Sequence, residues 1–417
     1  MHPEALQGVK EELVKLLCLA DVHLGSGQAY SDDRLADQEA VLNQIVDLAH
    51  DESVDLICAA GDLFHRPRPT PAALMVFRRF VDRLAHADIP CVAVTGNASH
   101  DIESADRPCA LDLFESRLFR VSRRPELITE FAGVAVATLP SVPVSRLVAG
   151  SESAERGPVF AQAAEALLNI AHEHVDRWIG HGPIMLMAHW SISGAALPNG
   201  LPVADLHEPI LDLAAFERIG YDAIVAGHIH RFQELATDSA DPELPVFYTG
   251  SPLPVDFGEA DHPHGCVILE FQSPIGAQRP RFVPLESRRF VTIDCDLTAD
   301  RIIASATIDP GIYEHPTDIL SVSIAEHFPL TDAVVRLRYR CREEQQRRID
   351  LPAIKKLIAD AGAHKLYQVA PEIVREDRAR VAGVDENLSP QEALRAWVEA
   401  NGLSEDQAAR LRELMEA

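Results

Sequence analysis

The stretch LCLADVHLG, residues 17–25, is an apolar run that ends at once in two polar side chains, Asp21 and His23. A short apolar run that stops at a polar residue and a glycine is typical of a buried strand in a parallel sheet. Comparable strand candidates lie at 16–20, 54–59, 91–94, 134–139, 184–188 and 222–226. Helical patterns between them lie at 37–50, 70–86 and 159–178. This alternation predicts a layered α/β domain, with a further strand pair, 246–249 and 266–271, closing the sheet.

Length and composition describe an ordinary globular chain of more than one domain. The chain has 417 residues, of which 47% are hydrophobic and 24% charged, and this excludes collagen-like, fibrous and disordered classes. No stretch approaches ~18 uninterrupted apolar residues, and residues 1–15 lack the apolar core of a secretory signal. Seven cysteines lie far apart without a CxxC pair, as expected for free thiols in a reducing compartment. We therefore expect a cytoplasmic protein that does not enter a membrane.

The pattern changes after about residue 280. Strand candidates at 291–295, 319–324, 334–341 and 365–369, with a helix at 352–361, predict a small α+β domain. Two capping boxes, Ser389 to Glu392 and Ser404 to Gln407, predict short C-terminal helices. The expected division is a large domain at 1–280, a small α+β capping domain at 281–374, a polar linker at 375–388 and a helical segment at 389–417.

Polar side chains directly follow five of the predicted strands. They are Asp21 and His23, then Asp62 and His65, then Asn97 with His100 and Asp101, then His189, and finally His228 and His230. Open α/β sheets bind ligands at the carboxyl ends of their strands. Carboxylate oxygen and imidazole nitrogen without thiolate suit Mn²⁺, Fe or Zn²⁺ in an open catalytic site. Successive β-α-β units would bring these groups together, and the sequence therefore predicts a dinuclear metal site.

Six stretches together resemble the calcineurin-like metallophosphoesterases. They are LCLADVHLG (17–25), AAGDLFHRPRPT (59–70), VAVTGN (92–97), AHWSISGA (188–195), VAGHIHRF (225–232) and YTGSPLPVDFGEA (248–260). Within that superfamily, the last two and the GDLFHRP stretch favour the SbcD-type nuclease subunit of DNA-end-processing complexes. The resemblance covers about residues 14–272. It implies a layered sheet sandwich flanked by helices, with a smaller α+β capping domain behind it.

The resemblance also implies the ligands of two divalent metal ions, which we expect to be Mn²⁺. One ion would be held by Asp21, His23, Asp62 and His230, and Asp62 would bridge to a second ion held by Asn97, His189 and His228. Two cations ~3.5–4 Å apart can share a carboxylate and clamp the attacking and leaving oxygens of a displacement at phosphorus. Because Asn97 supplies a neutral oxygen, the site would keep net positive charge for a phosphodiester.

The third motif departs from the family pattern. The family has Asn-His-Asp in direct succession, whereas here residues 98–99 separate Asn97 from His100. Either the two extra residues loop out and return His100 to its place as general acid, oriented by Asp101, or His100 is displaced and turnover falls. His65 resembles a family position near the substrate phosphate. Alternatively, it bonds the backbone at the approach to a helix.

The chain is acidic overall, because 38 Lys and Arg against 64 Asp and Glu give a net charge of −26. Since Lys and Arg bind the phosphates of nucleic acids, contact with nucleic acid would need a local basic surface. Arg66 and Arg68 follow the second metal motif and are candidates. Arg336, Arg338 and Arg340 alternate with apolar residues, so on a strand they would share one face as a basic stripe. Alternatively, that stripe is a solvated sheet face whose charges are paired with nearby glutamates.

The resemblance implies a Mn²⁺-dependent DNA nuclease that acts in DNA repair or recombination. Such a nuclease would act as an exonuclease on duplex ends and as an endonuclease on single strands or hairpins. The partners implied are DNA and an SbcC-like ATPase docked on residues 389–417, although those helices could instead pack on the small domain. We also expect a homodimer. Two rival functions are a phosphoesterase acting on a small molecule or phosphoprotein, and a DNA-end-binding scaffold whose altered third motif has disabled catalysis.

Overall fold

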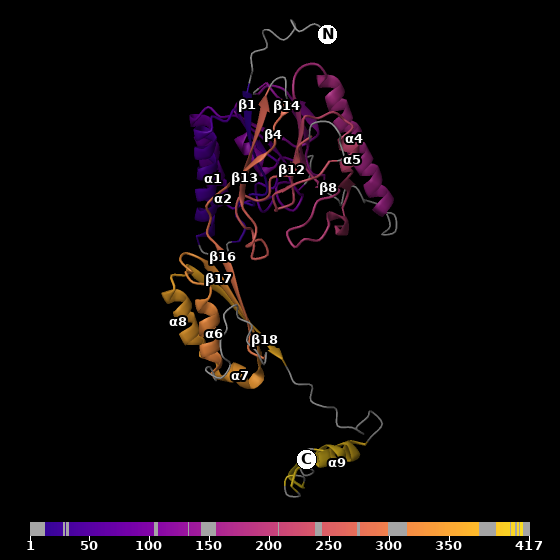
Figure 1. Cartoon of the computed structure of the whole chain (residues 1–417). Coiled ribbons are helices and arrows are strands. Elements are labelled where there is room, and N and C mark those ends of the chain that lie inside the picture. Colours follow the sequence, from indigo (N-terminus) through magenta and orange to yellow (C-terminus); the bar gives the residue numbers. More distant parts are fainter. Residues whose placement is uncertain are drawn as a thin grey trace. The chain divides into compact units, whose positions relative to one another are not determined.

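A computed structural model of the chain (Figure 1) describes residues 13–27, 30, 33–103, 107–131, 133–142, 156–206, 208–237, 244–272, 276–298, 315–374, 389–400, 402–404, 407 and 409–411. Its contacts divide the chain into two units. The first comprises Met1–Thr292, Phe328–Arg336 and Ile358–Gln368, and the second comprises Ile293–His327, Leu337–Leu357 and Val369–Ala417. The expected linker 375–388 lies outside the described residues, and the domain boundaries drawn from the sequence stay predictions.

The first sheet of the large unit has the order β14-β13-β1-β2-β3-β4, with β15 also paired to β13. Its strands are β1 Leu13–Leu19, β2 Leu56–Ala59, β3 Cys91–Val94, β4 Phe119–Ser122, β13 Gly265–Gln272, β14 Gly276–Ala277 and β15 Arg281–Pro284. Strands β1 to β4 are parallel. The crossovers contain α1 (Arg34–Asp51) and α2 (Pro71–His86). Helix α2 begins where Thr70 caps the backbone N–H of Ala73 and a proline occupies the first turn.

The second sheet has the order β11-β12-β10-β7-β6-β5. Its strands are β5 Glu126–Ile128, β6 Ala135–Leu139, β7 Ile184–His189, β10 Ala223–Gly227, β11 Gln233–Glu234 and β12 Val246–Tyr248. Strands β6, β7, β10 and β12 are parallel. Helix α4 (Arg156–Trp178) packs against this sheet through buried residues that include Leu167 and Ala171.

The two sheets face each other across an apolar core. Side chains alternate along a strand, so Leu17 and Leu19 of β1 pack with α1 and α2, whereas Leu16 and Cys18 face the second sheet. Met187 of β7 belongs to the same inter-sheet core. The result is a sandwich with α1 and α2 outside one sheet and α4 outside the other (Figure 1), as the resemblance implied.

One expected pairing is wrong. The strands expected at 246–249 and 266–271 do not pair to close a single sheet, because β12 and β13 belong to different sheets. Strand β13 lies antiparallel to β1, with Leu269 opposite Leu16, whereas β12 lies parallel to β10, with Val246 opposite Ile224. The apolar runs marked both strands correctly but carried no information about their partners.

A third sheet has the order β16-β17-β18, formed by β16 Phe290–Asp296, β17 Val334–Arg342 and β18 Lys365–Val374. The helices in this part of the chain are α6 Pro316–Ala325, α7 Glu343–Arg348 and α8 Leu351–Asp360. The strand expected at 319–324 is wrong, since these residues form α6. His315 caps that helix, Pro316 starts it, and Leu320 and Ile324 are buried one turn apart.

Shorter elements complete the described chain. They are β8 Ser191–Ile192, β9 Ile210–Leu211, α5 Leu213–Phe216, the 3-10 turns Ala110–Phe114 and Val203–Asp205, and the C-terminal α9 Pro390–Ala400. Ser389 and Glu392 form the expected capping box at the start of α9. Of the helices described, none has the length and apolar content needed to cross a bilayer.

Candidate metal centre

The polar residues singled out in the sequence meet where the strands of both sheets of the large unit end. Asp21 and His23 follow β1, Asp62 follows β2, and Asn97 follows β3. From the second sheet, His189 ends β7, and His228 and His230 follow β10. Parallel strands present their carboxyl ends at one edge, and the inter-sheet packing brings the two edges together.

The site is built by close backbone approach as well as by its side chains. A Cβ atom added to Gly61 would lie 2.3 Å from Nδ1 of His189, and one added to Gly96 would lie 2.0 Å from Oδ1 of Asp62. Real Cβ atoms do not approach other atoms so closely. Glycine is therefore required at both positions, and the G-D and G-N pairs of the sequence have a steric cause.

The carboxylate of Asp62 lies at the centre of the cluster and is almost completely buried. Its Oδ2 lies 3.4 Å from Nε2 of His189 and 3.7 Å from Nε2 of His23. It also lies 3.9 Å from Nε2 of His100. Its Oδ1 accepts a hydrogen bond of 2.6 Å from the backbone N–H of Asn97. This single carboxylate thus contacts residues of both sheets, as a bridging ligand must.

Asp21 and His230 complete a second group of donor atoms. Both oxygens of Asp21 accept the backbone N–H of His228 at 3.0 Å, and Nε2 of His23 lies 3.0 Å from Nε2 of His230. Two sets, Asp21 with His23 and His230, and Asp21 with Asp62 and His189, each have ligand atoms within 4.8 Å of one another.

The donor set fits divalent cations. The Nε2 atoms of His23 and His230 lie 3.0 Å apart, so both imidazoles could hold the same ion. The Nε2 atom of His189 is buried without a hydrogen-bond partner although its Nδ1 donates to the backbone oxygen of Ala60 at 2.7 Å. A buried ring nitrogen without a hydrogen-bond partner beside a carboxylate is suited to a metal ion, which would take the place of any proton on that nitrogen.

Buried acids and histidines shift each other's pKa at this site. Burial alone would lower the pKa of His189, but Asp62 and Asp21 outweigh it and raise that pKa to about 9. Burial alone would raise the pKa of Asp62, but the rings of His189 and His23 hold it well below its usual range. Burial lowers the pKa of His23. An ionised Asp62 and a neutral His23 are the protonation states that a metal ion needs.

Asn97 follows β3 of the first sheet and contacts residues that follow strands of the second sheet. Its Nδ2 lies 3.0 Å from Nδ1 of His228, and its Oδ1 accepts a hydrogen bond of 3.2 Å from Ser141. Turning the amide by half a turn exchanges the two atoms, and the Ser141 hydroxyl can then accept instead of donate. The Asn97 oxygen would thereby face the same side as Nδ1 of His228, as its expected role requires.

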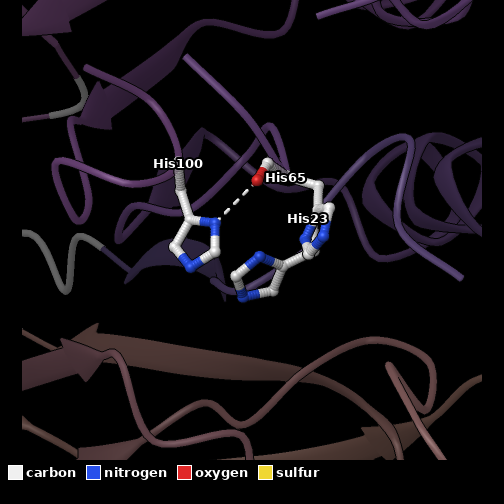
Figure 2. A group of neighbouring side chains, drawn as sticks. All are labelled: His23, His65 and His100. Atoms are coloured by element: carbon white, nitrogen blue, oxygen red, sulfur yellow. Dashed lines mark hydrogen bonds between the residues drawn. The ribbon is translucent and has the colours of Figure 1, made fainter. Parts of the chain in front are cut away.

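Three histidines from three loops, His23, His65 and His100, form a cluster (Figure 2), and two of them, His23 and His100, lie within 4 Å of the Asp62 carboxylate. The ring centroids of His23 and His100 are 4.4 Å apart, and those of His65 and His100 are 5.4 Å apart. Residues 98–99 lie in a turn closed by a hydrogen bond of 2.9 Å from the backbone N–H of His100 to the oxygen of Asn97. His100 therefore lies beside Asp62, and its action as general acid stays a prediction.

The expected orienting role of Asp101 needs correction. The Nδ1 atom of His100 donates to the backbone oxygen of His65 at 2.8 Å, drawn dashed in Figure 2. Asp101 is fully buried and accepts the backbone N–H groups of Leu63, Phe64 and Gly96 at 2.8–3.2 Å. Burial and the nearby Asp62 raise the pKa of Asp101 to about 6. This carboxylate therefore ties the second and third motifs together through their backbones.

Two glutamates that the sequence analysis did not single out contact the histidine pair after β10. Glu208 Oε1 accepts Nε2–H of His228 at 2.7 Å, and Glu259 Oε1 accepts Nδ1–H of His230 at 2.5 Å. Glu259 stands in the quoted stretch at 248–260, so its motif was a usable signal. Glu208 lies outside the six quoted stretches, and no pattern in the sequence indicated it.

The candidate DNA contacts near the second motif lie on the surface. Arg66 is exposed. Arg68 is also exposed and forms an ion pair with Glu103, with 2.7 Å between Nε and Oε1. An exposed pair of this kind is worth only about 0.2–1 kcal/mol, so Arg68 could exchange it for a phosphate at little cost.

The arginine stripe does occupy one face of β17, whose apolar residues are buried on the other. Arg336 donates to Thr292 and lies over the ring of Phe257. Arg338 pairs with Asp294, and Arg340 pairs with Asp296 and Glu372. The acids that face the stripe therefore come from the neighbouring strands β16 and β18. A role of this stripe in DNA binding stays a prediction.

Comparison with known proteins gives one family and several relatives. A family model described as calcineurin-like phosphoesterase matches residues 14–232. The chain is 26% identical to the SbcD component of nuclease SbcCD from Escherichia coli K12, over 59% of this chain and 62% of that protein. It is 29% identical to the DNA double-strand break repair protein Mre11 of Haloferax volcanii, over 69% of this chain and 56% of that protein. It is 32% identical to the protein of the same name from Methanosarcina mazei, over 68% of this chain and 40% of that protein. The matches thus span less than two thirds of these relatives.

Proposed function

This chain belongs to the calcineurin-like phosphoesterase family, and from that premise we propose that it is a DNA nuclease that depends on two divalent metal ions. The observation that supports the proposal most strongly is the convergence of donor atoms from both sheets on the buried Asp62 carboxylate. The names of its relatives, a component of a nuclease and DNA double-strand break repair proteins, favour DNA as the substrate.

The proposed ligands fall into two sets that share one carboxylate. Asp21, His23, Asp62 and His230 would hold one ion, and Asp62 with Asn97, His189 and His228 would hold the other. Two such ions, when bound, polarise a phosphodiester and make water a stronger nucleophile at neutral pH. Oxygen and imidazole donors without thiolate suit Mn²⁺, Fe and Zn²⁺, and of these we propose Mn²⁺, the ion that the family resemblance implies.

His100 is the proposed general acid. Its Nδ1 donates to the backbone oxygen of His65, and its Nε2 points toward the metal centre, 3.9 Å from Oδ2 of Asp62. The side chain is about one-fifth exposed, so a substrate could reach it. A proton on Nε2 would pass to the leaving oxygen of the broken phosphodiester. His65 would support this action through its backbone oxygen, with its ring beside the same phosphate.

The partners follow from the relatives' names and remain proposals. Arg66 and Arg68 lie just after Asp62 in the chain and would contact DNA phosphates near the cut bond, with the arginines of β17 as a second surface. One relative is a component of a nuclease with more than one kind of chain, and we propose that this chain likewise works with an SbcC-like ATPase, docked on α9 and the residues after it. We also propose a homodimer.

Cleavage of DNA by the purified full chain tests the proposal. Linear duplex and hairpin DNA are incubated with the protein and Mn²⁺, beside the His189→Ala variant and a small chromogenic phosphodiester. We expect the wild type to cut DNA and the variant to lose activity by at least about a hundredfold. Cleavage by both proteins indicates a contaminant. Cleavage of the small diester alone favours a small-molecule phosphoesterase, and bound metal without any cleavage favours the scaffold.

A further inference from the structure

Two carboxylates outside the proposed ligand set contact the two histidines of the segment after β10, and they do so through opposite ring nitrogens. Glu208 Oε1 lies 2.7 Å from Nε2 of His228. Glu259 Oε1 lies 2.5 Å from Nδ1 of His230. The two histidines are only two residues apart, yet the glutamates come from segments about fifty residues distant from each other in the sequence.

Each contact dictates where the proton of the ring lies. An ionised carboxylate only accepts hydrogen bonds, so the nitrogen that faces it carries the hydrogen. His228 is then protonated on Nε2 and presents the lone pair of Nδ1, which lies 3.0 Å from Nδ2 of Asn97. His230 is protonated on Nδ1 and presents Nε2, which lies 3.0 Å from Nε2 of His23. The free nitrogens thus face different partners.

Both glutamates are themselves held in place. The oxygen of Glu208 that contacts His228 also accepts the hydroxyl of Ser191 at 2.6 Å, two residues beyond His189. The other oxygen of Glu259 accepts the backbone N–H of Val255 at 2.8 Å. The Glu259 side chain is 8% exposed and that of Glu208 is 22% exposed. A carboxylate with several fixed partners can orient a ring, whereas a mobile one cannot.

We propose that Glu208 and Glu259 are positioning residues that fix opposite tautomers of His228 and His230, and thereby assign the two neighbouring histidines to different metal ions. His228 would bind through Nδ1 beside Asn97, and His230 would bind through Nε2 beside His23. This inference rests on the metal centre of the proposed function. Partners of metal-bound histidines typically change metal affinity by about 10–100-fold when removed.

Metal binding by single variants tests the inference without any use of DNA. Mn²⁺ is titrated into the full-length wild type and into Glu208→Ala, Glu259→Ala and the matched control Glu234→Ala, whose carboxylate forms an exposed ion pair with Arg279. Binding is measured by calorimetry and by the spin-coupled EPR signal of a Mn²⁺ pair. We expect two ions in the wild type and the control. Each glutamate variant should bind one ion about 10–100-fold more weakly and lose the coupled signal.

The conservative variants separate orientation from folding. Glu208→Gln and Glu259→Gln keep an oxygen that can accept the ring N–H, so they should recover most of the lost affinity if orientation is the cause. Histidine ring ¹⁵N spectra of the Zn²⁺-loaded wild type should show His228 protonated at Nε2 and His230 at Nδ1. If an alanine variant does not fold, the glutamine variant and these spectra still test whether the glutamate orients its histidine.

The outcomes distinguish this inference from the function on which it rests. Two ions bound with unchanged affinity in both alanine variants, or the same tautomer at His228 and His230, overturns the inference and leaves the proposed nuclease intact. A wild type that binds no divalent ion overturns the proposed function itself. Weakened binding in Glu234→Ala equal to that in the other variants indicates a general loss of stability and also overturns the inference.

Discussion

At the scale of single residues, the site depends on backbone conformations that most side chains avoid. Asp21, His23 and Asp62 have φ angles of 55°, 46° and 53°, and His228 has 95°. Such a conformation costs of the order of 1–3 kcal/mol at each non-glycine residue. Backbone hydrogen bonds hold it, including those from Asp21 to Gly61 and from His23 to Asp62 at 2.9–3.0 Å. The strand ends are therefore fixed before any substrate binds.

Asp101 gives a prediction at this scale. Replacing it with alanine leaves up to three buried backbone N–H groups without their acceptor, and each such group costs about 1–3 kcal/mol. We expect Asp101→Ala to lower the free energy of unfolding by at least about 2 kcal/mol, measured by urea unfolding followed by circular dichroism. The control is Asp51→Ala, since that side chain is 79% exposed. Equal stability of the two variants would contradict the bridging role of Asp101.

At the scale of secondary structure, alternation alone gave a wrong prediction for residues 319–324. The sequence ILSVSI alternates as a strand does, but its apolar residues at positions four apart also suit one face of a helix. Residues 319–324 form a helix and not a strand because the chain before them carries helix-start signals: His315 caps the helix and Pro316 lies in its first turn. The capping boxes at Ser389 and Ser404 were predicted from the same kind of signal, and both form.

Helix α9 carries a prediction about the proposed partner. Trp397 on this helix is 44% exposed, and Trp is enriched among the few interface residues whose truncation costs about 2 kcal/mol or more. We expect Trp397→Ala to weaken binding to an SbcC-like ATPase by at least about tenfold, measured by surface plasmon resonance. The exposed Glu399 on the same helix provides the control, Glu399→Ala. Unchanged affinity of the Trp397 variant would point to a different docking surface.

At the scale of the large unit, the proposed metal ions would link two sheets. Asp21, Asp62 and Asn97 come from one sheet, and His189 and His230 come from the other. Ions that bind only the folded state stabilise it by mass action. They should therefore resist separation of the sheets as well as serve catalysis.

Thermal denaturation provides the corresponding prediction. Free Mn²⁺ at a hundred times its Kd adds about 2.7 kcal/mol to the free energy of unfolding for each site. We therefore expect the Tm of the protein to rise by roughly 5–10 °C. Addition of EDTA should reverse the shift, and His189→Ala should reduce it. A Tm that does not respond to Mn²⁺ or EDTA in the wild type would contradict binding across the two sheets.

The sequence by itself determined the apolar strands, the helices between them and the polar residues at the strand ends, because burial and helix capping leave local patterns in neighbouring residues. Only the tertiary structure decided that β12 and β13 belong to different sheets, that His100 returns to the cluster past residues 98–99, and that Glu208 reaches His228. Those facts depend on contacts between segments far apart in the chain. No local pattern records such contacts, since they exist only once the two sheets have packed.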